Sequence, residues 1–327
     1  MEADRVPDPW LAADPWLTRA SVAYLGFPVV AFLAIWLRPA IGLPAALATV
    51  AGLGGLWRAM PAAPEGGGGR PPYAKAVLAS LIVALVATCL SGAGGVGLQN
   101  WDYDKHNAVL HDLVTRPLPI RYADEGDPAL AGPLVYYMGW YMPAMLVGRA
   151  LGWGAANAAL FVWTFLGIGL ALLWFARLTR ATAWWAPLFL LFFSGLDVLG
   201  ATLQGRNVVG MTNLELHHWA WLAQYTHNMA LINWVPHHAI PMWLATGLVL
   251  YEILVRQRRE TLLGPWALLP FWSPWIFLGV APLALIGALR GKGRVIGWAS
   301  VAVVVGSLPF VLAFLASNRG AVVRGWA

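Results

Sequence analysis

The sequence is short of cysteine and of charge. Its 327 residues include one cysteine, Cys89, which excludes an intrachain disulfide and a Cys-x-x-Cys metal site. Only 11% of the residues are charged, against about a quarter in a soluble domain. The net charge of +6 gives no indication of nucleic-acid binding, because much of it falls in short loops between apolar runs. Such placement is typical of the positive-inside rule of membrane proteins.

What the sequence does contain is apolar runs, several of which reach membrane-spanning length. A helix needs about 20 apolar residues to cross the hydrocarbon core of a bilayer. The runs lie at roughly 21–37, 40–57, 76–95, 133–150, 156–176, 183–200, 238–255, 262–289 and 295–316. Twenty tryptophans suit the aromatic belts at the two membrane surfaces. We therefore predict an all-α polytopic membrane protein with about 8–10 transmembrane or re-entrant helices.

The basic loops divide this chain into two parts. Residues 1–75 are expected to form an N-terminal helical hairpin and a cytoplasmic linker that contains four consecutive glycines. Residues 76–327 are expected to form the transmembrane core, with polar loops at 96–132 and 201–235 on the outer side. No Gly-Lys-Ser/Thr follows the glycine run, so we interpret it as a linker rather than a phosphate-binding loop.

This topology contains a conflict. Three apolar runs separate the two outer loops, although an even number of crossings is required. We expect the run at 133–150, which is interrupted by Pro143, to re-enter or tilt rather than cross. Broken backbone is tolerated at membrane depth where it lines a cavity. The proline-rich run at 262–289 poses the same problem, because basic residues flank it on both sides.

The densest ionisable group follows the run at 76–95, where membrane meets water. It consists of Asp102, Asp104, Lys105 and His106. Two carboxylates one residue apart can share a divalent cation, Mg or Mn, or divide acid and base roles. The alternative is structural. Asn100 would then cap a helix, the carboxylates would stabilise its first turn, and Asp102 would pair with His106 four residues later.

Two further sets of side chains are candidates for a site. Asp197 lies in an apolar run, where a charge is costly unless it faces protein or water. It is either functional, or a carboxylate that snorkels to the membrane surface or caps the following segment. The second outer loop contributes Arg206, the best cation for a phosphate, and ends in Trp234, His237 and His238. An imidazole or indole there could contact a phosphate or a sugar, although paired histidines are also common as hydrogen-bonded structure.

Together these parts resemble the GT-C superfamily of integral membrane glycosyltransferases. The similarity covers roughly 75–290. It rests on Asp102-Tyr103-Asp104-Lys105-His106, the helical pattern up to Thr115, and Gly132-Pro133-Leu134-Val135-Tyr136-Tyr137. The resemblance implies a GT-C-like fold in the cell (inner) membrane with its active site on the outer face. It also implies transfer of a hexose or pentose from a polyprenyl-phosphate donor to a glycan, lipid or protein acceptor.

The resemblance also assigns roles to residues. Asp102 and Asp104 are the expected catalytic residues and metal ligands, and a second outer-side carboxylate matches Asp197. The expected substrate-binding residues are Lys105, His106, Tyr136, Tyr137, Asp197, Arg206, Trp234, His237 and His238. The lipid bilayer is the expected partner, and a divalent cation is the one cofactor considered.

Two other functions stay open. A non-catalytic transporter or lipid-handling protein would use Asp197 and the histidines to line a path or proton relay. A metal-dependent membrane oxidoreductase is a weaker alternative. The seven histidines lack the i,i+3 or i,i+4 arrays on several helices that a di-iron site requires.

Overall fold

The chain folds into a helical bundle. The computed structural model describes residues 15–59, 74–122, 132–181, 183–194, 196–205, 226–256, 258–290, 294 and 296–318. Within them, the one sheet is a two-residue antiparallel pairing of β1 (Arg121–Tyr122) with β2 (Gly132–Pro133). Five helices are long and apolar enough to cross a membrane, at Trp16–Trp36, Pro39–Ala59, Trp153–Thr179, Pro236–Arg256 and Trp298–Ala316. The predicted all-α polytopic membrane class is confirmed.

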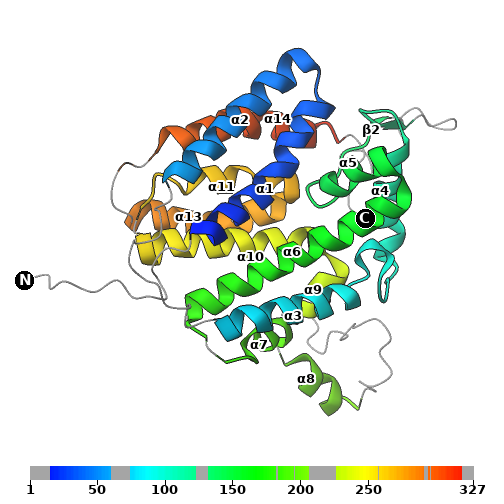
Figure 1. Ribbon diagram of the computed structural model, residues 1–327, viewed down its shortest axis with the longest axis vertical. Coiled ribbons are helices and arrows are strands. Elements are labelled where there is room, and N and C mark those ends of the chain that lie inside the picture. Colours follow the sequence, from blue (N-terminus) through cyan, green and yellow to red (C-terminus); the bar gives the residue numbers. More distant parts are fainter. Residues whose placement is uncertain are drawn as a thin grey trace, which may run out of the picture.

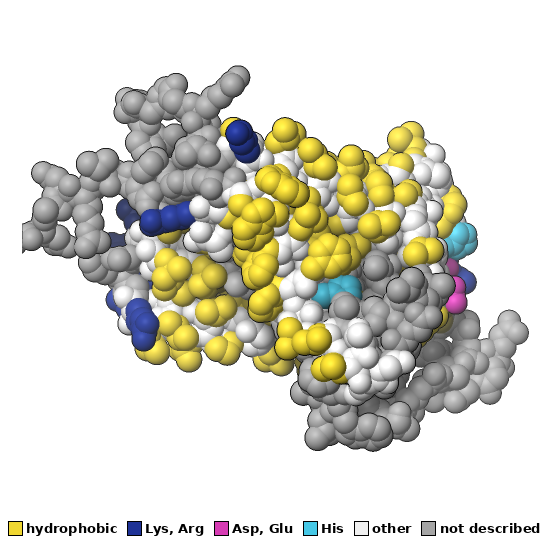
Figure 2. All heavy atoms as spheres, turned by 90° about the horizontal axis from the view of Figure 1, so that it is seen from below, with side chains coloured by type: hydrophobic (Ala, Val, Ile, Leu, Met, Phe, Trp, Pro, Cys, Tyr) yellow, Lys and Arg dark blue, Asp and Glu magenta, His cyan; other side chains and the backbone are white. Residues whose placement is uncertain are grey.

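The bundle has two chemically different ends. Figure 1 shows α4 (Asp102–Thr115) and α5 (Met142–Leu151) at one end, and the C-terminus of α6 (Trp153–Thr179) at the other. In Figure 2, Lys and Arg side chains gather toward one side of the view, acidic and some His side chains lie at the other, and hydrophobic side chains cover the surface between. The first is called the basic end and the second the α4 end. This distribution is typical of a protein oriented across a bilayer.

The N-terminal hairpin packs on the last described helix. α1 (Pro15–Trp36) and α2 (Pro39–Ala59) run side by side, and α2 lies against α14 (Trp298–Ala316). Their backbones approach closely at glycines: a Cβ on Gly52 would lie 2.7 Å from the backbone nitrogen of Val303. Small residues permit such close packing in membranes, where burial from water supplies no attraction between helices.

The run at 133–150 does not form a spanning helix. Its only helix, α5, has 10 residues and is therefore about 15 Å long, half the hydrocarbon thickness. α5 packs against α4 and the beginning of α6 at the α4 end. The run therefore lacks a helix of spanning length, as expected for the exception to the crossing pattern, whereas α6 is long enough to span. α3 (Ala74–Leu90), which precedes this run in the chain, also packs against α6.

The run at 183–200 was expected to be a continuous crossing, and this was wrong. It is broken into α7 (Ala186–Phe192) and α8 (Asp197–Leu203). The carbonyl of Leu190 in α7 accepts a hydrogen bond of 2.7 Å from Asn228, the first residue of α9 (Asn228–Trp234). α7 follows the basic end of α6, and α9 ends beside α4. Two short helices from separate parts of the chain thus lie against each other.

The proline-rich run folds back on itself as a helical hairpin. α11 (Leu263–Ala267) and α12 (Leu269–Trp272) lead inward, and α13 (Pro274–Arg290) returns after an extended Ser273. The indole of Trp272 at the tip donates to the carbonyl of Leu25 in the middle of α1, at 3.0 Å. The other ends meet again, because Arg259 donates to the carbonyl of Ala288. A segment that enters and leaves at the basic end explains why basic residues flank it on both sides.

The remaining spanning helix, α10 (Pro236–Tyr251), starts at the α4 end and continues into a π-helical turn, Glu252–Arg256, at the basic end. There Arg256 pairs with Glu252 at 2.5 Å and donates to the carbonyl of Ala59 at the end of α2. The chain therefore returns to the basic end next to the hairpin of α1 and α2.

Candidate functional site

A buried amide network holds the α4 end together. The side-chain nitrogen of Asn233 donates to the carbonyls of Ser91 and Leu98, at 3.2 and 3.0 Å. Asn100 donates to the side-chain oxygen of Asn233 at 2.9 Å, and Tyr103 donates to Ser91 at 2.6 Å. Asn233 is completely buried. The network therefore fixes the end of α3, the start of α4 and α9 relative to one another.

The first turn of α4 separates its two carboxylates. The side-chain oxygen of Asn100 accepts from the backbone nitrogen of Asp102 at 2.9 Å. The N-cap of α4 is Trp101, not Asn100 as expected, and it makes no side-chain capping hydrogen bond. The side chain of Asp102 is only 14% exposed and pairs with Lys105 at 3.2 Å. Asp104 is exposed. Residues two apart on a helix do not face each other, so the two carboxylates point in different directions.

His106 is used as a structural link. Its Nε2 lies 3.2 Å from the carbonyl of Trp234, which can only accept, so Nε2 carries the hydrogen. Its Nδ1 then accepts from the hydroxyl of Tyr141 at 2.5 Å. Burial lowers the pKa of His106 to about 4, against the hydrogen bond to Trp234, which raises it. A neutral imidazole with both nitrogens occupied joins α4 to α9 and to the segment before α5, rather than to Asp102 as expected.

The predicted site residues from three distant segments meet around this imidazole. The ring of His106 lies 5.1 Å from that of His237, and His237 lies 4.1 Å from His238. The ring of Tyr137 is 6.1 Å from His237 and 5.3 Å from His238, and Tyr136 is 6.0 Å from His237. The histidine–tyrosine cluster is defined as His106, Tyr136, Tyr137, Trp140, Tyr141, His237 and His238.

His237 and His238 differ from His106 in their hydrogen bonding. His237 is 2% exposed, and its Nδ1 is buried with no hydrogen-bond partner within the described part of the chain. The Nδ1 of the half-buried His238 is likewise without a partner there. Both residues lie in the first turn of α10, whose N-cap, Val235, provides no side-chain oxygen. Most buried polar atoms are hydrogen-bonded, so two adjacent exceptions are informative.

The charges of Asp102 and Lys105 shift the pKa values of residues in the cluster. Burial, and then the charge of Asp102, raise the pKa of Tyr136 well above its ordinary value. Lys105 lowers the pKa of His106, and Asp102 raises it. Exposed Trp101 packs edge-on against Trp234 at 5.3 Å between ring centres. A carboxylate, an ammonium group and aromatic side chains therefore border the cluster on the α4 side.

Two expected site positions do not join the cluster, and a third cannot be placed. Arg206 lies outside the described residues. Asp197 begins α8, which Figure 1 shows well apart from α4, and its side chain is outside the description. Asp104 faces solvent. The expectation that Asp197 provides a second carboxylate beside Asp102 is not supported by the path of the backbone.

A metal site does not fit these residues. Among the side chains that the structure describes, no three or more from His, Cys, Asp and Glu are grouped so as to hold a metal ion. Asp102 is already paired with Lys105, and Asp104 faces away from it. The two carboxylates are therefore not placed to share a cation, which their spacing in the sequence had led us to expect.

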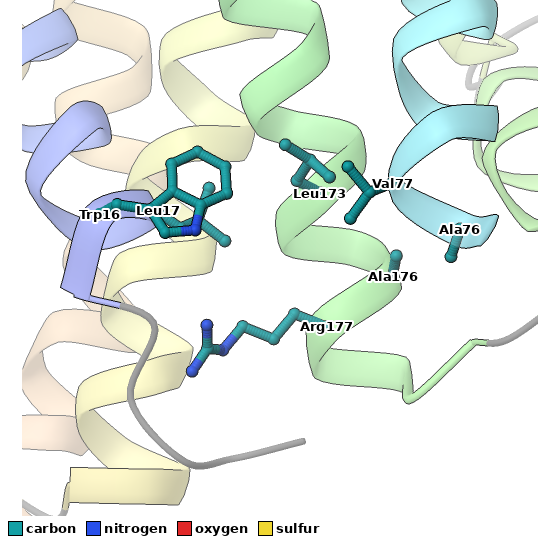
Figure 3. Close-up of a pocket in the computed structure, with 7 residues that line it drawn as sticks. All are labelled: Trp16, Leu17, Ala76, Val77, Leu173, Ala176 and Arg177. Atoms are coloured by element: carbon teal, nitrogen blue, oxygen red, sulfur yellow. The ribbon is translucent and has the colours of Figure 1, made fainter. Parts of the chain in front are cut away.

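A cavity at the basic end is too small for a substrate. It has a volume of ≈ 20 Å³, enough for about one water molecule. Figure 3 shows that α1, α3 and α6 surround it and that the side chain of Arg177 extends beneath Trp16 and Leu17. It is lined by Trp16, Leu17, Ala76, Val77, Leu173, Ala176 and Arg177. The histidine–tyrosine cluster remains the candidate site.

Several residues that build the site were not recognised in the sequence. Asn100 was expected only as a cap, and Asn233 and Tyr141 were given no role. Asn233 lies between Ile232 and Trp234, and an amide in such apolar surroundings must find partners. That signal points to a buried network but does not identify its members.

The comparisons with known proteins give no identification. No family model matches the chain, and neither a curated protein nor a solved structure matches it.

Proposed function

We propose that the protein is a membrane glycosyltransferase. It would move a sugar from a polyprenyl-phosphate donor to an acceptor at the outer face of the cell membrane. The observation that supports this is the convergence of α4, the segment 134–141 and the start of α10 on one cluster beside the Asp102–Lys105 pair. The positive-inside rule favours the outer side for this end, because the other end carries the basic loops.

In this proposal Asp102 is the catalytic base. Its carboxylate takes the proton from the acceptor hydroxyl as the acceptor oxygen bonds to the anomeric carbon of the sugar. The bond between that carbon and the phosphate oxygen breaks, and its electron pair stays on the lipid phosphate. A single displacement of this kind inverts the anomeric centre. Lys105, whose side chain is 47% exposed, offers its charge to the leaving phosphate.

The surroundings of Asp102 suit a lipid-linked substrate. Leu98 and Trp101 are exposed beside it, and apolar side chains cover the bundle between its two ends. A polyprenyl chain would lie in the bilayer against this apolar surface, while the phosphate and sugar reach the polar cluster. Tyrosine and tryptophan rings at such a boundary keep an apolar face in lipid and a polar group in water.

The test is sugar transfer in proteoliposomes with a labelled polyprenyl-phosphate sugar and a mixture of acceptors. Removing a general base typically costs about 100-fold or more, so Asp102→Asn should reduce the rate by at least that factor. Asp112→Asn is the matched control on the same helix, since Asp112 pairs with Arg116 at 2.8 Å outside the cluster. Full transfer by Asp102→Asn would refute the mechanism, and loss of transfer in Asp104→Asn alone would move the base to Asp104.

A second function is favoured by the interrupted crossings. The short helices α7 and α9 and the α11–α13 helical hairpin resemble the discontinuous helices that transporters use at their substrate sites. A transporter or lipid-handling protein would move the polyprenyl-phosphate compound across the vesicle membrane without breaking the sugar–phosphate bond. Flux with intact substrate in the same proteoliposomes would support this function over transfer.

A further inference from the structure

The three histidines of the cluster have different hydrogen-bonding roles. Both ring nitrogens of His106 are occupied, by Tyr141 and by the carbonyl of Trp234. The Nδ1 atoms of His237 and His238 are buried and have no partner in the described residues. An unpaired buried polar atom destabilises the folded protein, and two in succession indicate that something else completes them.

Their position favours an anionic partner. His237 and His238 are in the first turn of α10, a helix of 16 residues. The N-terminus of a helix carries a partial positive charge, which favours an anion. The backbone N–H groups of His238 and Ala239 already donate to the carbonyl of Val235, and Pro236 has none, so the two imidazoles are the donors offered to a ligand. No side chain of Val235 occupies that position as a cap. The rings of Tyr136 and Tyr137 border the two imidazoles on one side, and His106 borders His237 on another.

We propose that His237 and His238 form a phosphate-binding site at the N-terminus of α10. Each Nδ1, carrying its hydrogen, donates to a phosphate oxygen, while His106 fixes the surrounding backbone and does not touch the ligand. The phosphate is that of a polyprenyl phosphate or free inorganic phosphate. Its identity as the leaving group of a sugar donor rests on the proposed function, but the binding chemistry does not.

The proposal is tested by equilibrium binding to the purified full chain in detergent. The probes are radiolabelled polyprenyl phosphate, the matching polyprenol without phosphate, and inorganic phosphate as competitor. Glutamine replaces the Nε2 group of histidine but not Nδ1, so His237→Gln and His238→Gln should each weaken polyprenyl-phosphate binding at least tenfold. His111→Gln is the control, because His111 is exposed on α4 and packs on Trp153, away from the cluster.

The outcomes separate the sources of the phosphate. If inorganic phosphate displaces polyprenyl phosphate from the wild-type protein but not from either variant, the site recognises the phosphate group itself. Histidine-dependent binding without such competition assigns it to the lipid-linked form. Equal binding of polyprenol and polyprenyl phosphate, or unchanged affinity in both variants, would overturn the proposal. The half-buried His238 gives a usable variant if His237→Gln does not fold, as judged by thermal unfolding.

Failure of the two proposals can be told apart. Histidine-dependent binding without any sugar transfer would leave the phosphate site and end the transferase assignment. If sugar transfer depends on Asp102 but continues at the normal rate in both histidine variants, the transferase assignment stands and the phosphate site is ruled out.

Discussion

Replacing Asn233 with alanine should loosen the α4 end. The substitution removes three side-chain hydrogen bonds, two donated to Ser91 and Leu98 and one accepted from Asn100. At about 1 kcal/mol net for each, the expected loss of unfolding free energy is about 3 kcal/mol. Ser91 keeps its bond from Tyr103, and Asn100 keeps its bond to the backbone of residue 233, which limits the loss.

The measurement is thermal unfolding of the purified protein in detergent. At roughly 2–4 °C per kcal/mol, Asn233→Ala should lower the melting temperature by roughly 6–12 °C. Asn157→Ala is the matched control, since Asn157 only bonds to the carbonyl of Trp153 within its own helix. It should change the free energy by less than about 0.5 kcal/mol. Equal melting temperatures for the two variants would refute the view that the amide network fixes α9 against α3 and α4.

Because burial lowers the pKa of His106 from 6.5 to about 4, the unfolded chain binds more protons between these values, and stability should fall as pH drops from about 6.5 to 4. The full effect is about 3 kcal/mol, and the melting temperature of His106→Gln should depend less on pH over this window. Gly52→Ala should cost about 1–3 kcal/mol because its Cβ would strike the backbone of α14, whereas Gly54→Ala, with open space, should be neutral or stabilising in the same unfolding assay. Arg256→Met should cost about 3–5 kcal/mol by leaving Glu252 buried and unpaired, and Glu252→Gln in the same chain should recover most of it.

The membrane class could be predicted from the sequence because it depends on local composition. Runs of about 20 apolar residues and the basic loops between them need no tertiary information. The same reasoning identified 133–150 and 262–289 as exceptions, since charge placement requires a consistent count of crossings. It could not predict that the helix at 183–200 ends at Phe192 and a second one begins at Asp197, because hydropathy does not report where backbone hydrogen bonds are continuous.

The site could be predicted only in part. The sequence indicated His106, Tyr136, Tyr137, His237 and His238 as candidates, and the structure brings their rings within about 4–6 Å of a neighbour in the same group. The sequence could not separate the roles of these residues. Whether the ring nitrogens of a histidine have hydrogen-bond partners depends on residues more than 30 positions away along the chain. The contrast between His106 and His237 therefore appears only in three dimensions.

The site also lies where spanning structure is interrupted, and the bilayer connects these two facts. Backbone groups released by a break have no water to bond at membrane depth, so protein groups must satisfy them. Because the helix breaks between α9 and α10, the carbonyl of Trp234 has no helical partner, and it accepts a hydrogen bond from His106 instead. The break between α12 and α13 releases the carbonyl of Phe271, which accepts from the backbone nitrogen of Gly139, two residues before Tyr141. At both breaks, the carbonyl therefore accepts a hydrogen bond from a donor in α4 or in the segment 134–141. An unbroken bundle would need none of these polar groups, and nothing would then gather them at one end of the molecule.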